Sequence, residues 1–553
     1  MNRNTQNHFA NIPNIDIKRS QFKRPHTHKT TFSSGDIIPI YVDEILPGDT
    51  VNMRMAGAVR MATPIFPVMD NAYIDTYYFY VPFRLVWEHF QEFMGENKLT
   101  AWEQPIEYQI PQIKAPDGGW EAGTVADYMG IPTKVDNFEI SSLYFRAYAL
   151  IWNEWFRDQN LKDATMINKD DTTVTGKNDG DYVEIGQLGG KPLKAARYHS
   201  YFTSALPEPQ KGPDVLLPLG NTNGVIPVVT KNYAYYGDYD INAIPLRWTK
   251  NNTNIENGVY GLNLTGANDT GLNIQNPSNV LENSTVTPSN LFADTTLGGQ
   301  FNGSTINQLR QAFAVQRLYE RDARGGTRFR EIMRAHFGVT TPDARVQIPE
   351  YLGGFRQTIN MDQVIQMSNT TEVSPQGNAA AYSLTNFAGE VFTKSFVEPG
   401  ILMGLAVIRT DEGYQQGLEK FWSRKSRFDF YYPALANIGE QPIYNKEIFL
   451  QGTSEDDEVF GYQEAWADYR YKPNRVSGAF RSNYNGTLDS WHYYNNFNEL
   501  PTLSSEFIDA SPANIERTLA VQNEPQFIAD FMMDAIYTRP MPLYSVPGLI
   551  DHN

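Results

Sequence analysis

The 553-residue chain contains no cysteine, which excludes disulfide bonds, thiolate metal sites and cysteine nucleophiles. Long hydrophobic runs are missing as well. The longest, GILMGLAVI at 400–408, is too short to span a bilayer, and the N-terminus lacks the apolar region of a secretory signal peptide. We therefore expect a soluble protein that does not insert into a membrane.

The common catalytic motifs are also absent. There is no GxSxG, no HExxH and no phosphate-binding loop; GQLGGKP at 186–192 has the wrong spacing and a proline where a hydroxyl is required. His26 and His28 are too few ligands for a transition-metal site, and the acidic run 454–461 lacks the spaced carboxylates and central glycine of a calcium loop. We predict no catalytic residue, no metal site, no cofactor and no enzymatic activity, because paired carboxylates are common in any acidic chain and nothing else in the sequence calls for an enzyme.

Positive charge is the scarcer sign, because 46 Lys and Arg residues face 63 Asp and Glu residues, for a net charge of -17. Residues 1–35 are the exception. They carry a net charge of +5, so the remaining 518 residues carry -22. We interpret 1–35 as a basic N-terminal arm and 36–553 as an acidic body. An acidic body is a poor general binder of nucleic acid, whereas the arm suits either nucleic acid or an acidic protein surface.

Aromatic residues and turn-forming residues are abundant. The chain has 32 Tyr and 31 Phe together with 41 Gly and 33 Pro, a mixture that favours β-structure with long loops. The stretches 36–45, 73–87 and 400–408 are typical of strands, and 86–96 predicts a short helix. No repeat of fixed period is present, which argues against a propeller or a solenoid.

Residues 304–338 predict a helical insertion made of two consecutive helices. Thr305 and Gln308 fit a capping box at the start of the first helix, which a glycine pair ends. The second helix ends at Gly338. Just before this insertion, residues 251–303 contain twelve Asn and no Lys or Arg. Such a stretch buries little apolar surface, so we expect a turn-rich, exposed excursion.

Basic and aromatic residues alternate in KFWSRKSRFDFYYP at 420–433, and more weakly at 470–482. Cations neutralise phosphates and aromatic faces stack on unpaired bases, as single-strand binding requires. The alternative is a strand whose aromatic residues belong to the core and whose cations reach to solvent or pair with acidic residues. The candidate nucleic-acid contacts are Lys18, Arg19, Lys23, Arg24 and Lys29 in the arm and Lys420, Trp422, Arg424, Lys425 and Arg427 in this stretch.

Several stretches, in one order along nearly the whole chain, resemble the major capsid proteins of the microviruses, in the gokushovirus branch. These are small icosahedral bacteriophages with single-stranded DNA genomes. The resembling stretches are 19–50, 203–220, 320–354 (ERDARGGTRFREIMRAHFGVTTPDARVQIPEYLGG), 423–448, 464–482 and 539–552 (RPMPLYSVPGLIDH). None of them encodes catalysis.

The resemblance implies a mainly β fold: an eight-stranded viral jelly roll with long loop insertions and a few helices. Residues 36–553 would then form one domain, with 230–303 as a surface-exposed insertion loop that builds a protrusion at the three-fold axes. It further implies a T=1 shell in the virion that encloses a circular single-stranded DNA genome and is assembled in the cytoplasm of the bacterial host.

The partners that the resemblance implies are other copies of the chain, the genome, a small basic DNA-packaging protein, an internal scaffolding protein during assembly, and a host surface receptor. The candidate residues for host attachment run from Asn251 to Gly303. A jelly roll with many aromatic residues and carboxylates also suits a carbohydrate-binding protein or a carbohydrate-active enzyme, and this reading is the alternative.

Overall fold

The computed structural model describes residues 17–97, 107–215, 305–372, 375–522 and 524–545, together with the backbone of six short strands between 228 and 293. The chain divides into two compact units. One comprises Met1–Lys211 with Tyr319–Asn553, and the other comprises Gly212–Leu318. The six short strands and residues 305–318 belong to the second unit, and everything else below concerns the first unless stated. Within the described ranges, no helix has both the length and the apolar character needed to cross a membrane.

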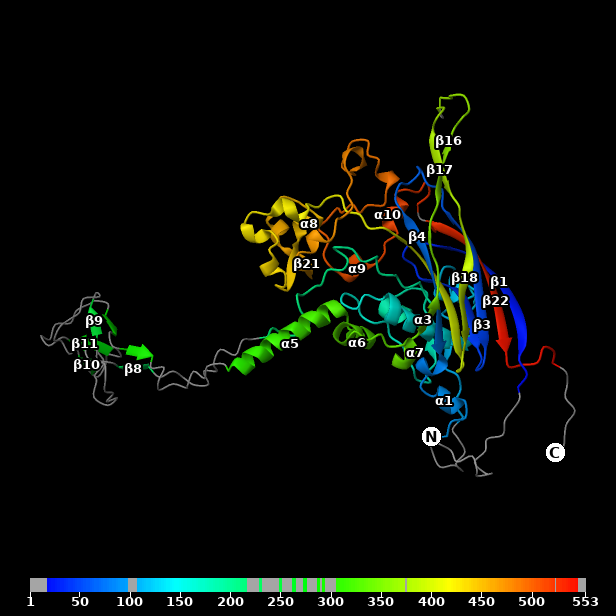
Figure 1. Cartoon of the computed structure of the whole chain (residues 1–553), viewed down its shortest axis with the longest axis horizontal. Helices are drawn as coiled ribbons and strands as arrows, with labels where there is room; N and C mark the ends of the chain where they lie inside the picture. The colour runs from blue at the N-terminus through cyan, green and yellow to red at the C-terminus, as the bar shows by residue number, and fades with distance from the viewer. Residues whose placement is uncertain are drawn as a thin grey trace. The chain divides into compact units, whose positions relative to one another are not determined.

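The first of two large sheets contains four antiparallel strands. Their spatial order is β1 (Ser20–Phe32), β22 (Phe527–Arg539), β3 (Thr50–Met61) and β18 (Thr385–Ser395). Figure 1 shows these four strands side by side, although β1 and β22 come from opposite ends of the chain.

The second sheet is built around β4 (Ala72–Pro82), which pairs along its whole length with β19 (Gly400–Thr410). β2 (Ile38–Ile45) pairs with the other side of β19. Because β19 occupies one edge of β4 throughout, β14 (Glu350–Gly353) and β15 (Arg356–Thr358) share the opposite edge one after the other.

Followed along the chain, the strands alternate between the two sheets, except that β4, β14 and β15 all belong to the second sheet. The last strand, β22, lies between β1 and β3 in the first sheet. This arrangement is a jelly roll. The prediction of a mainly β jelly roll is therefore confirmed. The count of eight strands is not confirmed, because the outer edge of β4 carries two separate strands and the sheets together contain nine.

The core between the sheets follows directly from side-chain alternation. Along β22 every second residue from Phe527 to Tyr537 is buried, whereas the residues between them are at least partly exposed. Residues of a strand point alternately to the two faces of its sheet, so one face of β22 packs inward and the other faces outward. The inward side chains join Ile40 of β2 and Leu402 of β19 in one cluster.

The second sheet is buried on both faces. A layer containing α3 (Leu143–Ile151) covers its outer face, where Phe79, Met403 and Leu405 pack against Trp120 and Trp152 among others. This explains the uninterrupted apolar run that predicts a strand at 400–408: in β19, residues on both faces need an apolar environment. The strands predicted at 36–45 and 73–87 are likewise present, as β2 and β4.

The remaining strands are short. They are β5 (Gln112–Lys114), β6 (Glu139–Ser141), β7 (Val174–Thr175), β16 (Met361–Ile365), β17 (Ala379–Ser383), β20 (Glu440–Tyr444) and β21 (Val459–Glu464), with β8 (Val228–Thr230), β9 (Trp248–Lys250), β10 (Gly261–Leu264), β11 (Leu272–Gln275), β12 (Val286–Pro288) and β13 (Leu291–Ala293) in the second unit. The last four lie within the Asn-rich stretch 251–303, and the rest of the predicted insertion 230–303 falls mostly outside the described residues.

The helices other than α3 are α1 (Phe90–Phe93), α2 (Val125–Tyr128), α4 (Tyr182–Ile185), α5 (Ile306–Gly325), α6 (Phe329–Phe337), α7 (Asp343–Val346), α8 (Asn445–Ile448), α9 (Ser505–Ile508) and α10 (Ala513–Glu516). α5 and α6 are the two helices predicted in 304–338. The predicted capping box is present: the backbone N–H of Thr305 donates to Gln308 Oε1 (3.0 Å) and that of Gln308 to Thr305 Oγ1 (3.2 Å). α6 ends where Gly338 adopts a left-handed φ of 69°.

Candidate nucleic-acid interface

The basic residues of the predicted arm lie on or beside a strand. Ser20–Phe32 form β1, an edge strand of the first sheet, and its residues pair with β22 in continuous register from Ser20 opposite Arg539 to Phe32 opposite Phe527. A strand fixed along thirteen residues presents its charges in a defined geometry, which an untethered tail does not do.

Three of the five arm cations are engaged inside the subunit. Arg24 forms an ion pair with Asp43 and its guanidinium lies 5.0 Å from the ring centroid of Tyr537. Lys29 Nζ lies 3.1 Å from Asp530 Oδ2, and Arg19 donates to the carbonyl of Gly48. Lys18 and Lys23 are exposed and form no ion pair with any residue that the structure describes. These two are the most available arm cations for an external anion.

The stretch 420–433 is not a strand. It consists of short 3₁₀ turns at Lys420–Ser423 and Arg427–Asp429, followed by a third that begins at Pro433. The exposed fractions of its aromatic side chains range from 41% for Phe421 to 68% for Trp422. The alternative that these rings belong to a strand in the core is therefore wrong. Exposed aromatic rings at this density mark a contact surface.

Two of the four cations in this stretch are anchored. Arg424 forms an ion pair with Asp468 and lies 4.4 Å from the ring centroid of Tyr469. Lys420 Nζ donates to the carbonyl of Pro442 at 2.8 Å. Arg427 lies 5.4 Å from the ring centroid of Phe428, and neither it nor Lys425 forms an ion pair within the described residues. Arg427 and Lys425 therefore keep their charge for a partner.

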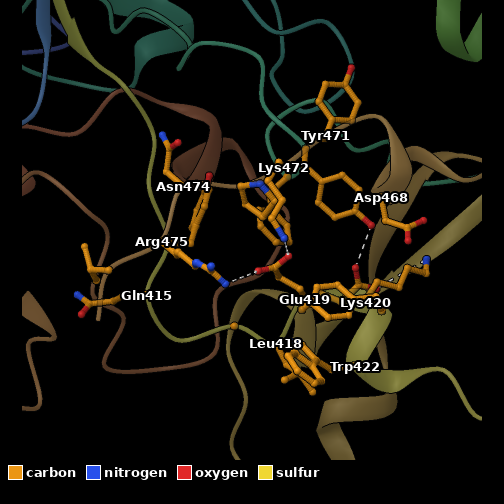
Figure 2. Close-up of a pocket in the computed structure, with 18 of the residues that line it drawn as sticks. Gln415, Leu418, Glu419, Lys420, Trp422, Asp468, Tyr471, Lys472, Asn474 and Arg475 are labelled. Carbon is orange, nitrogen blue, oxygen red and sulfur yellow. Dashed lines mark hydrogen bonds and ion pairs between the residues drawn. The ribbon is translucent and has the colours of Figure 1, made fainter. Parts of the chain in front are cut away.

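The two basic and aromatic stretches meet at one pocket, which has a volume of about 420 Å³ (Figure 2). One wall comes from 417–424 and another from 468–476. Tyr201, Phe202 and Tyr414 are buried residues that also line it, and they belong to the cluster that packs around β20 and β21. The weaker basic and aromatic stretch at 470–482 and the stronger one at 420–433 therefore contribute two walls of the same pocket.

Carboxylates balance most of the charge of this pocket. Glu419 binds Lys472 and also lies 3.6 Å from Arg475, as the dashed lines of Figure 2 indicate. Glu447 accepts a hydrogen bond from Tyr201 Oη at 2.9 Å. Burial raises the pKa of Glu447 above its usual range, although the positive charge of Lys420 opposes that shift. The lining is consequently aromatic, and its carboxylates offset part of its positive charge.

Tyr201, Phe202 and Tyr414 were missed by sequence reasoning because nothing local distinguishes them from ordinary core residues. Tyr201 and Phe202 lie far from 420–433 in the chain, and only the tertiary fold brings them to the pocket, whereas Tyr414 lies just before that stretch. Elsewhere, the ring of His26 lies edge-on to Tyr41, and His28 Nδ1 lies 3.1 Å from the carbonyl oxygen of Ile40. The described part of the chain holds no group of three or more His, Asp or Glu side chains with metal-site geometry.

A two-sheet jelly roll with long insertions belongs to the architectural class used by viral coat subunits and by lectins. The comparison with known proteins separates these two possibilities. The model of the capsid protein (F protein) family matches residues 10–549, and the chain belongs to this family of phage capsid proteins.

Three curated relatives are each described as capsid protein VP1. That of Spiroplasma virus 4 is 43% identical over 549 residues, which cover 98% of this chain and 97% of the relative. That of Bdellovibrio phage phiMH2K is 42% identical over 554 residues (99% and 98%), and that of Chlamydia phage 1 is 40% identical over 587 residues (98% of each). The carbohydrate-related alternative receives no support from these relatives.

Proposed function

We propose that this chain is the major structural subunit of a small phage virion, in which copies of it close into an icosahedral T=1 shell around a circular single-stranded DNA genome. The observation that carries the proposal is the family match over residues 10–549, with similarity to three capsid proteins along nearly their whole lengths. The jelly-roll sandwich supports it, because its loops and sheet edges offer surfaces for lateral contacts between copies.

Assembly of the purified chain tests this proposal. We expect sedimentation and electron microscopy to detect closed shells, alone or after addition of an internal scaffolding protein. A chain that stays monomeric under every assembly condition and is missing from particles of infected cells would contradict the proposal.

For DNA contact we propose the ten candidates in the arm and in 420–427, with unequal parts. Lys18, Lys23, Lys425 and Arg427 contact phosphates, because none of them forms an ion pair within the described residues. Arg24 and Arg424 chiefly position neighbouring groups, since each is already paired with a carboxylate. Subunits with a net charge of -17 do not neutralise a genome, so a small basic DNA-packaging protein completes the interior.

For host attachment we propose the stretch from Asn251 to Gly303, as a surface insertion that meets a receptor. Its composition supports this role, because a stretch with twelve Asn and no Lys or Arg is suited to solvent and not to a core. It also belongs to the second compact unit, so its removal leaves the sandwich complete. A chain without residues 251–303 should still assemble but should no longer attach to host cells; attachment that survives the deletion would exclude this role.

A further inference from the structure

Trp422 and Phe421 are aromatic side chains that lie outside the core of the subunit. Their ring centroids lie 4.7 Å apart at the pocket, and their side chains are 68% and 41% exposed. Lys472 Nζ lies 5.0 Å from the centroid of the Phe421 ring. Exposed aromatic side chains gathered beside a pocket are what a subunit offers to a partner group that buries them.

The chemistry of the lining restricts that partner. An isolated phosphate meets only part of the cationic charge here, because Glu419 already pairs with both Lys472 and Arg475, and Asp468 pairs with Arg424. A basic peptide meets net repulsion, because the lining holds five cations (Lys420, Arg424, Lys472, Arg475 and Arg481) and three carboxylates (Glu419, Glu447 and Asp468). An uncharged planar group gains stacking without either penalty.

We propose that the pocket binds a single base of single-stranded DNA, stacked on Trp422 and Phe421. The inference rests on the proposed function and names the group that this site takes. A volume of about 420 Å³ lies at the lower end of the range of small-ligand pockets, which suits one nucleotide and not a folded element.

The phosphates flanking the bound base lie outside the pocket. Lys425 and Arg427 follow Trp422 closely in the chain and form no ion pair among the described residues. They therefore supply the sequence-independent part of binding, which depends on salt, whereas the ring stacking supplies a part that depends on the presence of a base. This division makes the proposal testable with two oligonucleotides that differ only in their bases.

The experiment measures the affinity of the full-length, unassembled chain for a 12-nucleotide single strand of mixed sequence and for an abasic strand of the same length, at one fixed salt concentration. Trp422→Ala should weaken binding of the normal strand roughly 5- to 150-fold, the range for loss of one base–aromatic stack, and leave binding of the abasic strand unchanged. Phe421→Ala should act in the same direction. Tyr382→Ala is the matched control, because it removes an aromatic ring that is 51% exposed on β17, outside the pocket.

Lys425→Ala with Arg427→Ala should weaken binding of both strands by the same factor. Because Trp422 is largely exposed, its removal should not shift the thermal unfolding midpoint, so a loss of binding does not report misfolding. Equal affinities of wild type and Trp422→Ala for the normal strand would overturn the base pocket. So would a Trp422-dependent affinity for a basic peptide without one for DNA. In both cases shell formation by the same protein preparation shows that the proposed function itself still stands.

Discussion

Replacing Asp75 with Asn should destabilise the unassembled subunit by about 3–5 kcal/mol. Asp75 lies in β4 with its side chain 3% exposed, and its carboxylate collects donors from three other parts of the chain. Arg356 Nε of β15 lies 2.7 Å from Oδ1. Arg409 Nη2 of β19 and Tyr198 Oη both lie 2.7 Å from Oδ2. One carboxylate of β4 therefore ties β15 and β19 to the segment that carries Tyr198.

The magnitude follows from what the substitution leaves behind. Asn keeps the shape of the side chain but removes its charge, so the guanidinium of Arg409 remains in place without its counter-ion. That side chain is only 12% exposed, and an uncompensated buried charge costs about 3–5 kcal/mol. Arg356 adds little to this figure, because its side chain is 55% exposed and solvent replaces the lost carboxylate.

Urea unfolding of the unassembled subunit, followed by far-UV circular dichroism, measures the effect. Asp530→Asn is the matched control, because Asp530 also lies on a strand and pairs with Lys29, but those side chains are 47% and 72% exposed. We expect the control to change the free energy of unfolding by less than about 1 kcal/mol. Similar small losses for both variants would refute the buried charge cluster on β4.

Three further predictions concern acid stability, the core and the arm. Burial acts to raise the pKa of Asp75, but its hydrogen bonds to arginine and tyrosine outweigh burial, so the folded pKa lies below the unfolded value of about 3.9. The stability that the Asp75 carboxylate contributes is therefore complete above the unfolded pKa and is lost as pH falls through the lower folded pKa. With Asp75→Asn, the free energy of unfolding should fall less steeply as pH is lowered through this range, as urea unfolding at a series of pH values would measure. Phe531→Ala should cost about 3–5 kcal/mol in urea unfolding, because its ring is buried between the sheets, whereas Ile528→Ala on the exposed face of the same strand should cost less than about 1 kcal/mol; equal losses would contradict the assigned faces. Lys18→Glu with Lys23→Glu should leave shells able to form but reduce their DNA content, measured by the absorbance ratio of purified particles; unchanged content would remove the arm from DNA packaging.

Local patterns predict those parts of the fold that depend on local physics. The sequence predicts β19 because a strand buried on both faces needs a continuous apolar run. It predicts the end of α6 because a left-handed backbone favours glycine. No local pattern of this kind predicts β1. Its partner β22 lies about 500 residues away, and its inward positions include Arg24 and His28 at the edge of the sandwich, so the usual alternation is lost.

The candidate site shows the same division. The alternation of basic and aromatic residues in 420–433 marks one wall of the pocket, because its exposed rings stand out from any core pattern. Tyr201 and Phe202 are buried aromatic residues like many others in the chain, and their place in the site depends on contacts between distant segments. Ion pairing is equally non-local: which cations remain available depends on acids such as Asp43 and Asp468, whose positions no sequence pattern gives.

The most direct test of the central claim is a cryo-electron microscopy reconstruction of virus particles whose coat protein is this chain. We expect a closed icosahedral shell in which every subunit fits the density with its two facing sheets, β1-β22-β3-β18 and β2-β19-β4 with β14 and β15. Particles whose shell density has no place for this sandwich, or particles that lack the chain altogether, would contradict its role as the capsid subunit.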